Sequence, residues 1–167
     1  MTDEADVWKR FTCLLPTADA DEVQGCRGIG EQEAGLDLLV GALLKHQVPL
    51  SETTRAEISV VAETWGVREA VSPRLLDCPG DGLPAALLLV EGPYTLELID
   101  PKLAGFLLVP WIRCTASGRL LIRAHAEEPW GLSLIPEHYA VLASEQGPSL
   151  RLFDSSAAWE ALQELAS

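Results

Sequence analysis

The stretch from Gly35 to Trp65 constrains the fold most strongly, because two amphipathic segments flank a break at Val48-Pro49. The first segment predicts a helix from about Glu31 to His46, with apolar residues at helical spacing: Leu36, Leu39, Val40, Leu43 and Leu44. Pro49 blocks continuation, and Ser51 is a good N-cap for a second helix. This second helix should bury Ile58, Val61, Ala62 and Trp65 and expose Glu52, Ser59 and Glu63 on its opposite face.

The remainder of the first half predicts shorter elements around this helical pair. Apolar spacing predicts a helix from about Glu4 to Leu15, which Pro16 ends. Residues 17–30 are acidic and then rich in glycine, which predicts a loop with at most one helical turn. Gly28-Ile29-Gly30 lacks the remaining residues of a phosphate-binding loop. A short helix is expected over residues 67–70 or 73–77.

A turn-rich segment, residues 78–82, separates this half from one with strand-like patterning. Alternation predicts a strand over Tyr94 to Ile99, and short apolar runs predict strands over residues 85–90 and 106–109. Pro110 should lie at a sheet edge or a bulge. Ser117-Gly118 predicts a hairpin between strands 111–115 and 119–125.

Two further strands and a helix are expected to complete the chain. The strands span residues 138–143 and 150–153, and Asp154 or Ser155 should cap a helix that buries Ala158, Ala161, Leu162 and Leu165. The predicted fold class is α+β. It consists of a helical half, residues 1–78, packed on a mostly antiparallel sheet with a C-terminal helix, residues 83–167, within a single domain.

The composition points to an acidic cytoplasmic protein. Its net charge is −13, which argues against nucleic acid and anionic membranes as partners and suits a basic protein. An acidic surface that only maintains solubility is the alternative. The first four residues lack a basic signal-peptide region, the four cysteines are widely spaced, and the apolar runs are too short to span a membrane.

Known catalytic motifs, metal-binding spacings and cofactor fingerprints are missing from the sequence, so a non-catalytic role without cofactors is favoured. A Cys114–His125 pair across the hairpin is conceivable as a nucleophile and base. Alternation in the hairpin places Arg119, Arg123 and His125 on one face, with Arg113 across from them. These four residues form a candidate anion site of a small-molecule-binding or enzymatic domain, in a pocket between sheet and helices. Alternatively, the arginines pair with Glu91, Glu97 and Glu127 on a polar outer face.

Residues 33–67 carry a family resemblance. The acid-led helix 33–39, the segment from Leu43 through Val48-Pro49-Leu50-Ser51, and the helix from Ile58 to Val67 resemble Maf-type immunity proteins of bacterial polymorphic toxin systems. The resemblance implies a stoichiometric inhibitor that folds alone and occludes the active site of a basic toxin. On this hypothesis Asp37, Glu52 and Glu63 are candidate contacts with the partner. An interaction or scaffold domain of a larger pathway is the third interpretation.

Overall fold

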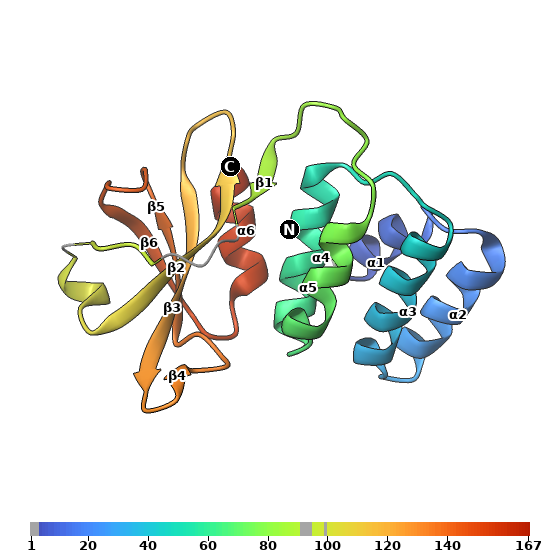
Figure 1. Ribbon diagram of the computed structural model, residues 1–167, viewed down its shortest axis with the longest axis horizontal. Helices are drawn as coiled ribbons and strands as arrows, with labels where there is room; N and C mark the ends of the chain where they lie inside the picture. The colour runs from blue at the N-terminus through green and yellow to red at the C-terminus, as the bar shows by residue number, and fades with distance from the viewer. Residues whose placement is uncertain (1–3, 91–94, 99) are drawn as a thin grey trace. The chain divides into compact units, whose positions relative to one another are not determined.

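The computed structural model describes residues 4–90, 95–98 and 100–167. The chain forms two compact units, residues 1–83 and 84–167 (Figure 1). The N-terminal unit is helical, and the C-terminal unit contains an antiparallel sheet and a helix. The α+β class predicted from the sequence is therefore confirmed. The expectation of a single domain stays a prediction.

The N-terminal unit contains five helices within its described residues: α1 (Glu4–Thr12), α2 (Thr17–Gly28), α3 (Gln32–Lys45), α4 (Glu52–Thr64) and α5 (Arg68–Asp77). Helix α3 packs against α2 and α5, and α4 packs against α5. The predicted apolar stripe of α3 is buried except for Leu44, which is half-buried. Ser51 caps α4 as expected, because its Oγ accepts a hydrogen bond of 3.0 Å from the Thr54 amide.

Helix α2 replaces the predicted loop over residues 17–30. Two glycines within the helix and a weak apolar pattern hide it from sequence reasoning. Tertiary contacts stabilise it instead, since Val23 is fully buried and Gln24 Nε2 donates to Thr12 Oγ1 at 2.9 Å. Packing on α3 thus overrides the low intrinsic helix propensity of the segment.

Helix α4 is buried over a wider arc than its sequence suggests. Ser59 is 1% exposed, and the Glu63 side chain is 8% exposed in an ion pair with Arg68, so the prediction that both face solvent is wrong. Trp65 is half-buried, and its Nε1 donates to Glu4 Oε1 at 3.2 Å. Helix α4 is enclosed because α5 packs against it. Helix α5 runs continuously through Pro73, whereas the sequence predicted one short helix over either residues 67–70 or residues 73–77.

The break after α3 is joined to the segment that follows α5. The Leu50 amide donates to Pro79 O at 2.8 Å, and the Asp81 amide donates to Leu50 O at 3.0 Å. Arg55 of α4, whose side chain is 5% exposed, donates to the carbonyl oxygens of Leu75 and Cys78 and pairs with Glu52. Arg55 therefore supplies donors to carbonyls at the C-terminal end of α5; the Leu75 carbonyl also accepts from the Cys78 amide at 3.3 Å.

The C-terminal unit is built on a six-stranded antiparallel sheet with the strand order β1-β2-β3-β5-β6, and β4 pairs with β3 off this path. The strands are β1 (Leu87–Leu89), β2 (Phe106–Cys114), β3 (Leu120–Glu128), β4 (Gly131–Leu132), β5 (His138–Leu142) and β6 (Ser149–Asp154). A short 3₁₀ helix, η1 (Pro101–Leu103), precedes β2. Helix α6 (Ala158–Ala166) packs on β2, β3, β5 and β6.

Strand β2 joins the two strands predicted on either side of Pro110. The register shifts between Pro110 and Ile112, so the expected irregularity at Pro110 is present. The hairpin turn is also as predicted: Gly118 has a φ of 72°, and its amide donates to Cys114 O at 2.9 Å. Of the strand predicted over residues 94–99, Tyr94 and Ile99 lie outside the described residues, and Leu96 forms a bridge with Leu108.

Both faces of the central strand β3 are covered. One face carries an apolar cluster that includes Leu108, Leu120, Ile122, Ala140 and Leu142, with Leu96 and Leu98 packed against it. Helix α6 covers the opposite face and buries the four residues predicted for its stripe. Its predicted cap is wrong, because Asp154 accepts hydrogen bonds from Ser156 in a preceding turn and the helix begins at Ala158.

Replacing Arg55 by alanine should destabilise the helical unit by about 2–4 kcal/mol, because the carbonyls of Leu75 and Cys78 lose their buried donor. Urea unfolding followed by circular dichroism measures the change. Arg10→Ala is the matched control: its exposed pair with Glu57 should contribute about 1 kcal/mol or less. Equal effects of the two substitutions would contradict the role given to Arg55.

Candidate functional site

The predicted basic face of β3 lies beneath α6. Arg119 Nη2 donates to Leu165 O, near the C-terminal end of α6, at 3.0 Å. The Arg123 guanidinium lies over the Trp111 ring, 5.4 Å from its centroid, and the residue is 6% exposed. The alternation of the strand is as predicted, but its arginines hold the helix and an aromatic ring of the same unit.

Arg113 does not join this face. The bulge at Trp111 places Arg113 opposite Leu120, whose side chain belongs to the apolar cluster on the other side of the sheet. Before the bulge Val109 pairs with Arg123. If that register continued without the extra residue, Arg113 would pair with Arg119. The Arg113 guanidinium instead forms an ion pair with Glu145. The four predicted anion-binding residues are thus divided between two faces.

His125 is a buried structural residue at the far end of the hairpin. It is 4% exposed, and its Nδ1 lies 2.8 Å from Ser133 O. Strand pairing places His125 beside Leu107, whereas Cys114 exchanges backbone hydrogen bonds with the turn at Gly118 and Arg119. The hairpin therefore separates Cys114 from His125, and the suggested nucleophile–base pair is not formed.

The three predicted partner contacts lie in different settings within the N-terminal unit. The Asp37 side chain is 68% exposed and pairs with Arg74, whereas that of Glu63 is 8% exposed. Glu52 is half-buried beside Arg55. Glu52 and Glu63 stand at opposite ends of α4, about 16 Å apart along its axis. Asp37 is thus the most accessible of the three, and α4 does not bring the two glutamates together.

A small groove of about 210 Å³ adjoins Asp37. Its charged lining residues are of both signs: Asp19, Glu22, Asp37, Lys45 and Arg74. His46 Nε2 lies 2.8 Å from Asp19 Oδ2, and this hydrogen bond is the largest influence that lowers the pKa of Asp19 below 3.8. The groove is a network of ion pairs among α2, α3 and α5, which fixes these helices relative to one another.

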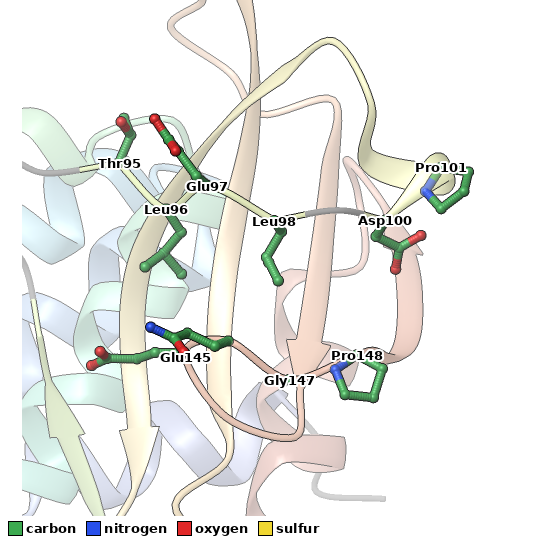
Figure 2. A pocket seen from close by; sticks show the side chains of 10 residues that line it. Thr95, Leu96, Glu97, Leu98, Asp100, Pro101, Glu145, Gly147 and Pro148 are labelled. Carbon is green, nitrogen blue, oxygen red and sulfur yellow. The ribbon is translucent and has the colours of Figure 1, made fainter.

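A larger open groove of about 830 Å³ lies in the C-terminal unit (Figure 2). Residues 95–98, 100 and 101 form one side, and the turn over residues 145–148 forms the other. Leu96 and Leu98 point toward the turn, while Thr95 and Glu97 point away from it. Asp100 accepts from the Lys102 amide and Glu145 pairs with Arg113, so these two carboxylates already have partners.

An exposed apolar loop between β3 and β5 was not foreseen from the sequence. Four large apolar residues there are exposed: Trp130, Leu132, Leu134 and Ile135. The signal in the sequence is the run Pro129 to Pro136, which is apolar without a helical or alternating period. An exposed patch of this kind marks an interaction surface more often than a catalytic site.

In the ranges 4–90, 95–98 and 100–167, no group of three or more histidine, cysteine, aspartate or glutamate side chains could hold a metal ion. No helix of those ranges is long and apolar enough to cross a membrane. Comparison with protein-family models, curated proteins and solved structures found no match to this chain.

Arg123→Ala should lower the free energy of unfolding by about 1–3 kcal/mol, because Trp111 loses the cation above its ring in the core. Thermal melts with and without inorganic phosphate, at matched ionic strength, separate this structural role from anion binding. We expect phosphate to leave the melting temperatures of both proteins unchanged. A phosphate-dependent rise in the wild type that is lost in Arg123→Ala would restore the anion-site hypothesis.

His46→Ala should raise the pKa of Asp19 toward 3.8, because the main hydrogen bond to the carboxylate is lost. Since folding lowers this pKa, ionised Asp19 stabilises the fold above pH 3.8, and the stabilisation is lost as the pH falls through the folded-state value. A titration of the Asp19 carboxyl carbon by nuclear magnetic resonance measures the shift. Lys45→Met is the control and should have a smaller effect; an unchanged pKa in His46→Ala would refute the assignment.

Proposed function

We propose that this chain is a non-catalytic, acidic cytoplasmic protein that binds a basic protein toxin and occludes its active site, as an immunity protein does. One observation carries the proposal: the excess of carboxylates remains after the chain's own basic side chains have been used within each unit. An acidic surface that serves solubility alone is the competing interpretation, and it requires no defined partner.

The basic side chains are largely engaged within their own units. Within the part of the chain that the structure describes, at least nine of the twelve lysines and arginines have an ion-pair, carbonyl or aromatic partner in their own unit: Arg10, Lys45, Arg55, Arg68, Arg74, Arg113, Arg119, Arg123 and Arg151. Against 25 acidic residues, the 12 bases leave an excess of 13 carboxylates (25 − 12). The field outside the protein is therefore negative and attracts basic partners.

The acidic excess extends over both units. Residues 1–83 carry 15 acids and 7 bases, and residues 84–167 carry 10 acids and 5 bases. A broad negative surface raises the rate of encounter with a basic protein and repels nucleic acid that would compete for it. These properties suit an inhibitor that must reach the active site of a basic toxin before the substrate does.

The helical pair α3–α4 supports the immunity proposal in particular. The resemblance to Maf-type immunity proteins covers this pair and the Val48-Pro49 break between its helices. Asp37, on the exposed side of α3, is available to a partner, although it must exchange its contact with Arg74 for one with the partner. The buried Glu63–Arg68 pair has a structural role.

Co-expression with the product of the neighbouring gene tests the proposal. We expect that product to be toxic alone, to be neutralised by this chain, and to form a complex that survives gel filtration at about 0.15 M salt. The association rate should fall at about 1 M salt, since the Debye length shrinks to roughly 3 Å. A harmless neighbour, or a toxic one that forms no complex with this chain, would refute the proposal.

A charge-matched pair of variants tests the contribution of Asp37. Asp37→Asn and Glu160→Gln each remove one exposed negative charge, from α3 and α6 respectively. If Asp37 contacts the partner, its substitution should raise Kd about fivefold or more, whereas Glu160→Gln should alter Kd less than twofold. Equal effects would assign only a long-range electrostatic role to Asp37.

A further inference from the structure

The loop between β3 and β5 displays large apolar side chains in water. Trp130 is 80% exposed, Leu134 is 86% exposed and Ile135 is 68% exposed, with Leu132 beside them at 40%. These four residues form the loop patch. Strand β4, which contains Leu132, pairs with the last residues of β3, and Figure 1 shows this small hairpin in orange at the end of β3. Exposure of four neighbouring apolar residues costs solvation free energy that a partner would recover.

Hydrogen bonds beneath the loop patch tie the loop to the end of β3. Ser133 is buried, and its amide donates to Ala126 O at 3.0 Å while its Oγ donates to Ile135 O at 2.9 Å. The Ala126 amide donates back to Ser133 Oγ at 3.1 Å, and His125 Nδ1 lies 2.8 Å from Ser133 O. The buried polar residues thus face inward and fix the apolar ones outward, which reduces the entropy lost on binding.

Acidic residues border the loop patch. Residues 126–137 include Glu127, Glu128 and Glu137 but no lysine or arginine, and Glu127 and Glu137 are exposed. Two copies of this chain would bring these carboxylates together, and an anionic lipid surface would repel them. The complementary surface is an apolar recess with a rim of lysine or arginine side chains.

We propose that the loop patch is the anchor by which this chain docks to a basic protein, with Trp130 inserted in an apolar recess and Glu127 and Glu137 paired with basic residues at its rim. The inference rests on the proposed function for the class of partner and adds the surface that binds it. Tryptophan is the residue most enriched among those that dominate interface energetics, since it buries a large area with few rotatable bonds.

A synthetic amphipathic helix with leucines on one face and lysines along its borders provides a probe of defined chemistry. Binding to the full chain should shift the emission of Trp130 to shorter wavelength, and Trp130→Phe should abolish the shift. The double variant Trp130→Ser with Leu134→Ser should bind the peptide about tenfold more weakly or worse. Leu83→Ser is the matched control, because Leu83 is 67% exposed far from the loop in sequence, and its Kd should change less than twofold.

Measurement with the basic neighbouring-gene product separates this inference from the proposed function. If that protein binds the wild type and Leu83→Ser but loses at least tenfold in affinity for the loop double variant, the inference is supported. If it binds all three equally, the inference fails while the proposed function stands. If it does not bind at all but the peptide binds at Trp130, the proposed function fails and the loop patch retains its role.

Two other results would overturn the inference. Peptide binding that is unchanged by the loop substitutions would show that the carboxylates alone attract it. Dimerisation of the wild type in sedimentation experiments, lost in the double variant, would make a second copy the occupant of the loop patch. Circular dichroism of each variant verifies the fold, which these exposed substitutions should leave intact.

Discussion

Burial of both faces of β3 is the constraint on which the C-terminal unit depends. A strand with one wet face could present Arg123 and His125 to a ligand, but α6 covers that face and the apolar cluster occupies the other. A buried guanidinium or imidazole must find partners inside the protein. Arg123 therefore stacks on Trp111, and His125 binds the carbonyl of Ser133. The bases of this unit are part of its architecture.

The N-terminal unit uses its bases in a similar way. Arg55 links α4 to the end of α5, and Arg68 is enclosed with Glu63. Each of these charges is balanced at short range, where the local dielectric makes good geometry valuable and a missing partner costly. Because the 25 acidic residues outnumber the 12 lysines and arginines, the net charge of the chain is negative.

An acidic exterior and an apolar loop make different contributions to recognition. Long-range attraction raises the rate at which a basic partner arrives, but screened surface charges contribute little to the final affinity. Burial of Trp130 and Leu134 contributes mainly to the lifetime of a complex. The reason is that their apolar surface leaves water, and the favourable free energy is gained, only when the two proteins touch. The hydrogen bonds of Ser133 bring the acidic and the apolar contributions together at one place, because they hold the apolar side chains of the loop between exposed carboxylates.

Sequence periodicity by itself determined the elements whose apolar pattern matches a helix or a strand. Helices α3 and α4, the Ser51 cap, the Ser117-Gly118 hairpin and the buried stripe of α6 follow from local spacing and backbone chemistry. Helix α2 required its packing on α3, because its own residues favour helix only weakly.

Tertiary structure also decided which polar residues remained accessible. One extra residue at Trp111 moved Arg113 to the opposite face, and α5 enclosed Glu63, since register and burial depend on partners distant in the chain.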